Sequence, residues 1–509
     1  MSGFRTKMSK TTSDRLTSSL AKWIALDCRP LLVVEDKGLE NVLQIATCDP
    51  TFQLPCRKTI SGKIQQLYDT EKQAKLDALQ KAEFVALTGD HWTSVSNSNY
   101  VGVTAHLADV TEGTWHLQSF ALTVQKTNTR HYAENCAEQF LSVAEEWGIQ
   151  QKVTTIGTDS ARTMMATARR LPFQHMPCVA HIVQRTITVS LADSGFSDAL
   201  AKCRKIVGHF KHSPANTDEL HQEQTRLGQE KESLIQDVST RWNSTLDMIS
   251  RLLKNQEAVF AALAKQKHKL VILTPSELVK LQKLATVLGP CRFVTELLGG
   301  ETYVSCSVVL PALCHLCHTM EVSDDDSAYM VKFKTAFKKD LSQRKATLNH
   351  EWLKMATVLD PRFKDLKCLA RGERAEVWTS LEALLQEQRQ GTTTQEPAKK
   401  KSLFLSPLSS ESDSDEEALC NRALSLYRAE STISETDCPL QWWSSRAGTH
   451  PQLSVLAHKY LTSPASSVPC ERLFSLAGHI VTKKRAALSS ENVNRLVCLS
   501  NWLKQREAK

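Results

Sequence analysis

The sequence lacks the features of a membrane protein, of a secreted protein and of an N-terminal zinc finger. No unbroken apolar run reaches the roughly 18 residues that a membrane-spanning helix needs. The polar, hydroxyl-rich N-terminus has no apolar centre of the kind found in secretory signals. Residues 1–83 contain Cys28, Cys48 and Cys56 but no histidine, so they cannot supply the paired cysteines and histidines of a finger. We therefore expect an intracellular chain without a membrane span.

Composition narrows the class of protein further. The 15 cysteines follow no spaced framework, which is typical of reduced thiols buried as small apolar side chains. Lysine and arginine number 63 against 55 acidic residues, and the resulting charge of +8 permits nucleic-acid binding only where basic residues cluster. At 509 residues, 41% of them apolar, the chain is expected to form roughly two to four folded units.

Strand-like patterning begins at residue 84. Segments 84–90, 100–107 and 115–124 are predicted strands of an antiparallel meander. A helix is predicted over 131–147, ended by Gly148, followed by a strand over 152–158 and a helix over 161–170. The order β-β-β-α-β-α, with Asp90 ending the first strand and Asp159 following the fourth, is typical of a ribonuclease-H-like layout.

The flanking segments have a different character. Residues 1–83 and 185–390 space their apolar residues as helices do, most clearly over 275–298. Residues 391–417 combine a basic triplet, two prolines, many serines and an acidic run, which predicts a disordered, solvated loop. The segment from residue 440 to the end is again apolar and helical, and no internal repeat is visible.

Two aspartates at predicted strand ends raise the question of a metal site. Cleavage of phosphodiester bonds commonly uses two divalent cations about 4 Å apart. Hard cations such as Mg²⁺ prefer carboxylate oxygens as ligands. A single aspartate is most often a turn, cap or surface residue, so residue type alone does not identify such a site.

The surroundings of three acids resemble the hAT family of DNA transposases. Residues 88–94 (TGDHWTS) and 100–106 (YVGVTAH) resemble the family's first-aspartate signature, and residues 158–164 (TDSARTM) resemble its second. Residues 466–478 (SSVPCERLFSLAG) resemble the block that carries the third acid, here Glu471. Ordered blocks at the correct relative positions make this resemblance specific, and it covers most of the chain.

Two further regions are similar to the family. Residues 440–503 look like its C-terminal dimerisation region, and their dense apolar residues are expected to be buried, in the core or against a second chain. Residues 54–60 (LPCRKTI) are similar to a block that precedes the catalytic domain in members with a BED zinc finger. The finger itself is expected to be missing.

The resemblance implies a site and an architecture. Asp90, Asp159 and Glu471 would be the catalytic residues and the ligands of two Mg²⁺ or Mn²⁺ ions. The fold would be α/β, with a ribonuclease-H-like domain interrupted by a long all-α insertion. The expected order is a helical N-terminal segment over 1–83, the first part of that domain over 84–184, the insertion over 185–390, a disordered loop and linker over 391–438, and the remainder with the dimerisation region over 439–509.

Two short motifs are candidates for supporting roles. Cys178 and His181 have the spacing of two metal ligands on one helical turn, and a similar pair follows the second aspartate in the family. A packed cysteine beside a hydrogen-bonded histidine is the simpler interpretation; catalytic support or a DNA contact is the other. Arg241 and Trp242 open a block (RWNS) that resembles a family motif, which predicts a phosphate contact and base stacking. Core packing of Trp242 stays equally open.

Three remaining patterns favour structural roles or leave alternatives open. The run CHLCH over 314–318 is interpreted as helix core rather than as a zinc site, because no partner pair is obvious. Asp360 before Pro361 predicts the cap of a new helix. The basic triplet Lys483, Lys484 and Arg485 could contact DNA phosphates, form a solvated turn or direct nuclear import; a second triplet over 399–401 is the better import candidate.

Two functions follow from these observations. The first is a metal-dependent DNA transposase, or a domesticated derivative, that cleaves DNA and joins strands at transposon ends. The alternative is a non-catalytic nuclear protein that binds DNA or chromatin, regulates transcription and dimerises through the C-terminal region. A generic ribonuclease-H-like nuclease is disfavoured by that region. In both cases we expect a nuclear homodimer or higher homo-oligomer that binds DNA and no membrane.

Overall fold

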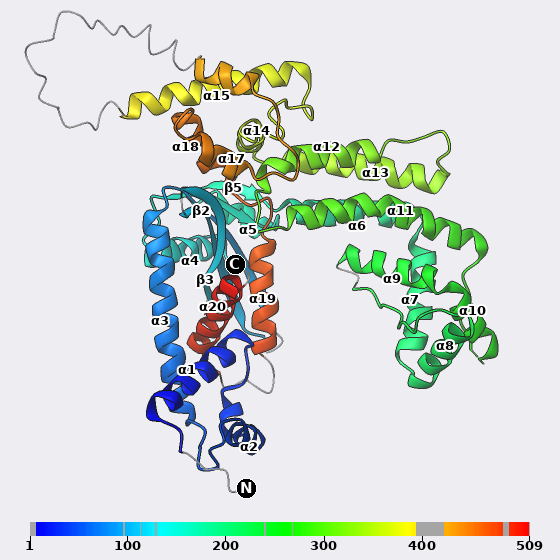
Figure 1. The fold of residues 1–509 in the computed structure, drawn as a ribbon. Coiled ribbons are helices and arrows are strands. Elements are labelled where there is room, and N and C mark those ends of the chain that lie inside the picture. Colours follow the sequence, from blue (N-terminus) through cyan, green and yellow to red (C-terminus); the bar gives the residue numbers. More distant parts are fainter. Residues whose placement is uncertain are drawn as a thin grey trace, which may run out of the picture. The chain divides into compact units, whose positions relative to one another are not determined.

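The structure is a computed structural model of the chain that describes residues 7–94, 97–111, 113–127, 130–238, 241–266, 268–392, 422–481 and 488–507 (Figure 1). It divides into two compact units. Unit 1 comprises residues 1–178, 300–307 and 351–509, and unit 2 comprises residues 179–299 and 308–350.

Unit 1 contains a sheet of five strands in the order β3-β2-β1-β4-β5. Its elements follow the chain as β1 (Val85–Thr93), β2 (Asn99–Thr111), β3 (Thr114–Thr127), α4 (Ala133–Glu146), β4 (Val153–Thr158), α5 (Arg162–Ala168) and β5 (Gln174–Pro177). The first three strands are antiparallel neighbours, whereas β4 runs parallel to β1 and to β5. The predicted meander and the order β-β-β-α-β-α are therefore confirmed, and the chain is mixed α/β.

Helices cover both faces of the sheet, and two glycines mark where they come closest. A Cβ atom at Gly89 would collide with the ring of Phe140 on α4. A Cβ atom at Gly102 would lie 2.7 Å from the ring of Phe474 on α19 (Val468–Ile480), on the other face. Helices on both faces explain why successive residues of β1 and β2 are buried over most of their length instead of every second one.

The end of α4 also follows the prediction from sequence. Trp147 closes the helix, and Gly148 follows with φ of +63°. Glycine adopts this left-handed conformation without the steric cost that a Cβ imposes, so the chain can turn here toward β4. The four-residue strand β5 was not predicted, because a segment that short carries no recognisable alternation.

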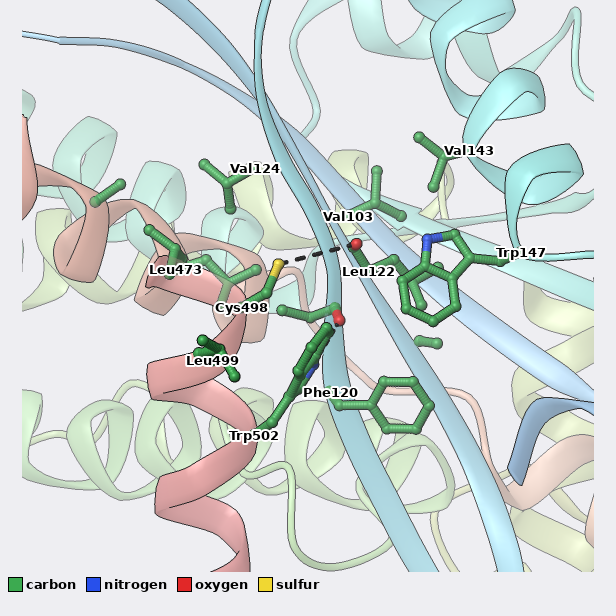
Figure 2. Packing of buried hydrophobic residues seen from close by; sticks show 14 of the residues in the cluster. Val103, Phe120, Leu122, Val124, Val143, Trp147, Leu473, Cys498, Leu499 and Trp502 are labelled. Atoms are coloured by element: carbon green, nitrogen blue, oxygen red, sulfur yellow. Dashed lines mark hydrogen bonds between the residues drawn. The ribbon is translucent and has the colours of Figure 1, made fainter. Parts of the chain in front are cut away.

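The N-terminal helices and the C-terminal helix share the core of the sheet. Unit 1 begins with α1 (Lys10–Leu26), the 3-10 helix η1 (Leu31–Glu35), α2 (Lys37–Ala46) and α3 (Arg57–Lys81), and it ends with α20 (Ser490–Glu507). Trp502 of α20 stacks on Tyr68 of α3 at 5.3 Å between ring centroids and donates from Nε1 to the Ala121 carbonyl at 2.9 Å. Figure 2 shows Cys498, Leu499 and Trp502 packed against the residues of β3.

This packing answers where the apolar residues of the C-terminal region are buried. The members of that set that are buried within the chain itself are Leu453, Leu456, Tyr460, Leu461, Leu473, Phe474, Leu496, Val497, Leu499, Trp502 and Leu503. The core alternative therefore accounts for them, and they are not a free surface for a second chain.

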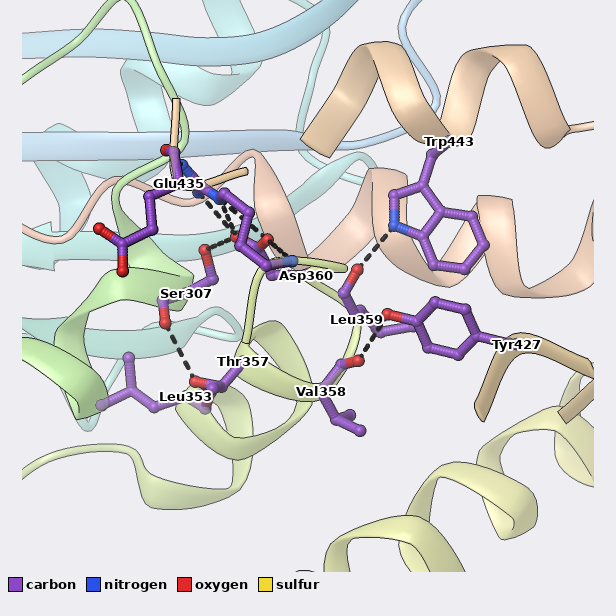
Figure 3. Close-up of polar contacts among 10 residues, drawn as sticks. Ser307, Leu353, Thr357, Val358, Leu359, Asp360, Tyr427, Glu435 and Trp443 are labelled. Atoms are coloured by element: carbon purple, nitrogen blue, oxygen red, sulfur yellow. Dashed lines mark hydrogen bonds and ion pairs between the residues drawn. The ribbon is translucent and has the colours of Figure 1, made fainter. Parts of the chain in front are cut away.

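Residues 351–392 belong to unit 1, although the predicted insertion extended to residue 390. The helices here are α14 (His350–Val358), α15 (Arg371–Thr392), α17 (Pro439–Arg446) and α18 (Pro451–Leu461). Tyr427 donates to the Val358 carbonyl at 2.8 Å, and Trp443 Nε1 donates to the Leu359 carbonyl at 2.6 Å (Figure 3). These buried aromatic anchors tie the end of α14 to the C-terminal part of the chain.

The structure describes only part of the predicted loop and linker over 391–438. Residues 393–421, which include the basic triplet over 399–401, lie outside the described residues. Residues 422–429 are helical, and Tyr427 within them is fully buried. The linker part of the predicted segment thus contains a helical stretch whose tyrosine ring fills a core position.

The predicted helix start at Asp360 is also wrong. The chain after α14 forms turns over 361–365, and Asp360 is fully buried instead of capping a helix. Its carboxylate accepts from Arg362 Nη2 at 2.7 Å and from the Ser307 hydroxyl at 2.6 Å (Figure 3). The Asp-Pro pair thus marks a buried ion pair that stabilises a turn.

In its described residues, unit 2 is helical and contains no strand, as predicted. Its helices are α6 (Val179–Asp193), α7 (Ser197–Lys211), α8 (Pro214–Arg226), α9 (Trp242–Lys254), α10 (Gln256–Lys265), α11 (Pro275–Leu298), α12 (Val309–Thr319) and α13 (Ala328–Lys345), with η2 (Cys306–Val308) before α12. A capping box formed by Thr274 and Glu277 starts α11 at the predicted residue. Among the described helices, none has the length and apolarity to cross a bilayer.

Candidate active site

Asp90 and Asp159 belong to two neighbouring parallel strands. Asp90 lies within β1, three residues before its end, instead of ending the strand as predicted, and Asp159 directly follows β4. Thr88 of β1 pairs with Gly157 of β4, and each aspartate lies two residues further along the chain. Side chains alternate along a strand, so Asp90 shares the sheet face of Thr88, whereas Asp159 lies one residue beyond the end of β4.

Helix α19 brings the third acid to the same face. Asp90 pairs with Gly102 across β1 and β2, and Phe474 and Cys470 of α19 pack over Gly102. Glu471 lies in the first turn of this helix, one residue after Cys470. All three acids are half-buried, which shields them partly while leaving their oxygens accessible to a cation.

The two aspartates are oriented by backbone donors. The N–H of His91 donates to Asp90 Oδ1 at 2.7 Å, and the N–H of Ala161 donates to Asp159 Oδ1 at 3.1 Å. Bonds of this kind hold a carboxylate in one rotamer. The carboxylates are thus positioned by the chain before any ligand arrives.

Two of the three acids affect the pKa of the Cys470 thiol. Its buried thiol donates to the Gly102 carbonyl at 3.1 Å. Burial raises the pKa of this thiol well above its usual value, and the Asp90 and Glu471 carboxylates raise it further. The thiol is therefore protonated at neutral pH, and both carboxylates act on one point of the structure.

Two histidines beside the aspartates are held neutral. Burial lowers the pKa of His175 to about 4, although the Asp159 carboxylate opposes this, and its Nε2 lies 2.9 Å from the Thr158 hydroxyl. Burial also lowers the pKa of His91, whose Nε2 lies 3.0 Å from Gln139 Oε1. Neutral imidazoles add no positive charge beside the aspartates at neutral pH.

The donor set fits hard divalent cations. The three carboxylates offer the oxygen ligands that Mg²⁺ and Mn²⁺ favour. Within the described residues, their oxygens do not all lie within 4.8 Å of one another. The thiol of Cys178 lies within 4.8 Å of a Glu471 carboxylate oxygen and adds a soft donor at the edge of the group.

The two supporting residues, Cys178 and His181, belong to different units. Cys178 is fully buried directly after β5, and its N–H donates to the Thr158 carbonyl at 2.8 Å, as a packed cysteine beside the site should. His181 lies in the first turn of α6, where unit 2 begins. The sequence did not single out Cys470, Gly102 or His175, although the first two lie within the quoted family blocks.

The residues predicted to contact DNA differ in accessibility. Arg241 is exposed at the start of α9, whereas Trp242 is only 3% exposed, as core packing predicts. The Trp242 N–H donates to Gln184 Oε1 at 3.2 Å, and the side chain borders a cavity of about 180 Å³ within unit 2. Lys483, Lys484 and Arg485 lie outside the described residues.

Three family models match the chain. The model of the hAT family C-terminal dimerisation region matches residues 423–503. The ZBED1 RNase-like domain matches residues 88–179, and the ZBED1 RNase-like helical domain matches residues 176–287. The first match includes Glu471, and the second includes Asp90 and Asp159.

Similar proteins extend along most of the chain. A putative AC transposase of Zea mays is 23% identical over 89% of this chain and 61% of its own length. Zinc finger BED domain-containing protein 4 of Homo sapiens is 23% identical over 96% of this chain and 44% of its own length. The putative transcriptional regulator tpeD of Talaromyces stipitatus is 23% identical over 94% and 60%. The chain thus spans less than two thirds of the length of these relatives.

Proposed function

Because the chain belongs to the hAT family of transposases and related proteins, we propose that it is a metal-dependent DNA transposase-like protein. In this proposal, Asp90, Asp159 and Glu471 hold two Mg²⁺ or Mn²⁺ ions and the reaction is DNA cleavage followed by strand transfer at transposon ends. The proposed architecture is a ribonuclease-H-like domain, built on the five-stranded sheet and α19, that is interrupted by the helices of unit 2.

One observation supports the proposal: Asp90 and Glu471 act on the same thiol, Cys470, and Asp159 follows the strand that pairs with the strand of Asp90. The parallel register of β1 and β4 aligns the two aspartates, and the packing of α19 on Gly102 adds Glu471. A structural role for any one of them would not require the other two. Three half-buried carboxylates gathered at one edge repel each other unless cations lie between them, so their convergence favours a metal site.

The chain's own residues would prepare the site for chemistry. Bound cations would supply positive charge at the attacking and leaving oxygens of the phosphodiester. The backbone donors of His91 and Ala161 hold the aspartates in place, and the protonated Cys470 thiol anchors α19 through Gly102. Neutral His175 does not compete for the charge of Asp159.

DNA, oligomeric state and location are part of the same proposal. Exposed Arg241 at the start of α9 is suited to a phosphate contact, because arginine forms bidentate bonds with phosphate oxygens. Trp242 could receive an unpaired base only if its ring left the core of unit 2. The match to a dimerisation region supports a homodimer, and the transposase and regulator relatives support a nuclear location.

A second function is a non-catalytic regulator that binds DNA or chromatin and dimerises through the C-terminal region. The observation in its favour is the similarity to a putative transcriptional regulator at the same 23% identity as to the transposase. In a regulator of this kind the carboxylates would be retained without a reaction to perform.

An assay of DNA strand cleavage distinguishes the two functions. The full chain is incubated with supercoiled DNA and Mn²⁺, alongside Asp90→Asn, Asp159→Asn and Glu471→Gln. The exposed Glu145→Gln serves as a matched control, because it removes one carboxylate away from the site. The transposase proposal requires Mn²⁺-dependent nicking that each triad variant loses and the control keeps. A wild-type chain that never nicks DNA would instead favour the regulator.

A further inference from the structure

Helix α13 of unit 2 is strongly basic. It carries six lysine and arginine residues and one acid, Asp340. Two of the six are paired with acids of the same unit. Lys332 and Lys339 are exposed, and within the described residues neither forms an ion pair. The helix dipole does not account for them, because it acts on the first and last turns and both lysines lie further in.

Contacts with α6 fix the direction in which these lysines point. Thr186 of α6 donates to Asp340 Oδ2 at 2.8 Å, so Asp340 faces α6. Phe196, which follows α6, lies 5.5 Å from Tyr329 at the start of α13, measured between ring centroids. A later residue of the first segment thus meets an earlier residue of the second, so the two helices run in opposite directions.

One side of the α6–α13 pair is the core of unit 2. Ile187 and Leu341 come directly after the two contact residues, and both are fully buried. Arg185 and Lys339 come directly before the contact residues, are turned about 200° from the buried pair and are exposed. Because the helices are antiparallel and share this core, Arg185 and Lys339 emerge together on the opposite, outer side.

That outer side is basic. Lys332 lies seven residues before Lys339, which is about two helical turns, and is therefore on the same face of α13. The exposed polar side chains that the structure describes on this side are Arg185, Lys332, Thr335, Lys339 and Gln343, and none of them is acidic. We call the three cations, Arg185, Lys332 and Lys339, the outer basic face.

Arg241 lies next to the outer basic face. The N–H of Trp242, the first residue of α9, donates to Gln184 Oε1 at 3.2 Å. Gln184 directly precedes Arg185, so the start of α9 is beside this part of α6. Arg241 itself is exposed. Two helices and the start of a third thus contribute cations to one region of unit 2.

We propose that the outer basic face binds the phosphate backbone of double-stranded DNA. Like charges on one side of a protein repel one another, and a polyanion removes that repulsion. Each phosphate that a cation neutralises releases counterions, which makes binding strong in low salt and weak in high salt. Contacts with phosphate carry no sequence information, so this face fixes where the duplex lies against unit 2. The proposal rests on the DNA binding that both proposed functions require.

The salt dependence of DNA binding tests the proposal on the full chain. Fluorescence anisotropy measures the affinity for a labelled duplex of random sequence at increasing KCl concentration. The triple variant Arg185→Gln/Lys332→Gln/Lys339→Gln is expected to bind more weakly in low salt. The slope of log affinity against log salt should decrease in magnitude by about 0.9 for each lost phosphate contact. A slope equal to that of the wild type would overturn the proposal, as would a wild-type chain that does not bind the duplex in low salt.

A control triple variant removes the same charge elsewhere in unit 2. Burial raises the pKa of the Cys317 thiol, whereas Lys345 and Lys338 lower it, so these two lysines turn toward α12. Lys283 is exposed on α11. Lys283→Gln/Lys338→Gln/Lys345→Gln should keep the wild-type slope, and urea denaturation checks that both triple variants fold. An equal decrease in the two triple variants would contradict the proposal, because net charge alone would then explain it.

Failure of this proposal is distinguishable from failure of the proposed reaction. A wild-type chain that nicks DNA, together with a triple variant that keeps the wild-type slope, would leave the transposase function standing and overturn the outer basic face. Binding of an acidic protein at this face in place of DNA would give the same unchanged slope. A chain that binds the duplex through this face and never nicks it would support the face and the regulator function together.

Discussion

The thiol of Cys470 donates a 3.1 Å hydrogen bond to the carbonyl oxygen of Gly102. Gly102 faces Asp90 across the strand pair, and Cys470 precedes Glu471 in α19. This one contact therefore links the helix that carries the third acid to the strands that carry the first. The distance between Asp90 and Glu471 therefore depends on the absence of a side chain at position 102.

We expect Gly102→Ala to disturb both the fold and the site. The added methyl group would lie 2.7 Å from the Phe474 ring and 3.0 Å from Cys470 Sγ. Overpacking of this kind costs about 1–3 kcal/mol, and moving α19 to relieve it displaces Glu471. The free energy of unfolding, measured by urea denaturation, and the rate of Mn²⁺-dependent nicking should both decrease. Gly62→Ala is the control, since nothing lies within 4 Å of that position on α3; equal stability losses in the two variants would contradict the close-contact explanation.

The sequence predicted the strands more fully than it predicted the packing. Apolar runs identified the segments of β1 to β4, because that signal is local, and the family blocks made the three acids candidates for a site. The contact of Gly102 with Phe474 is between residues distant in the chain, and nothing near Gly102 reveals what covers it. The prediction of a helix start at Asp360 was wrong for the same reason. An Asp-Pro pair favours a helix start locally, but Asp360 is held in the core by contacts with Ser307 and Arg362.

Loss of the buried cation at position 362 should be strongly destabilising. Asp360 is fully buried, and the Arg362 side chain beside it is only 9% exposed. Arg362→Met leaves an unpaired buried carboxylate, which costs about 3–5 kcal/mol of unfolding free energy. Chemical denaturation measures the loss. Lys22→Met removes a partner from a pair that is 49% exposed on both sides and should change stability by less than about 1 kcal/mol. Similar effects of the two substitutions would refute this ranking.

His106 is expected to make the fold sensitive to acid. Burial lowers its pKa from 6.5 to about 3. Between these values the unfolded chain binds a proton that the folded chain excludes, so stability falls as the pH is lowered, by up to about 1.4 kcal/mol per pH unit. His106→Gln should flatten this dependence between pH 6 and 4, measured by denaturation at each pH, whereas the exposed His116→Gln should not. An unchanged slope in His106→Gln would rule out this residue as the cause.

The proposed homodimer would need a surface other than the apolar residues already buried in the core. Within residues 423–503, Leu426 is the exposed large apolar residue in the described part of the chain, at 49% exposure. We expect Leu426→Glu to shift the homodimer toward monomer in light scattering coupled to size exclusion. Leu32→Glu, which changes a similarly exposed leucine in unit 1, should leave the mass unchanged. A dimer that tolerates Leu426→Glu would assign the contact to other residues.

Binding of Mn²⁺ tests most directly whether the three acids form one metal site. Free Mn²⁺ is measured by electron paramagnetic resonance during titration of the full chain. The account predicts saturable binding in the wild type that weakens in Asp90→Asn, in Asp159→Asn and in Glu471→Gln, and that is unchanged in Glu145→Gln. Wild-type affinity in all three triad variants would contradict it, because the three carboxylates would then not share a cation.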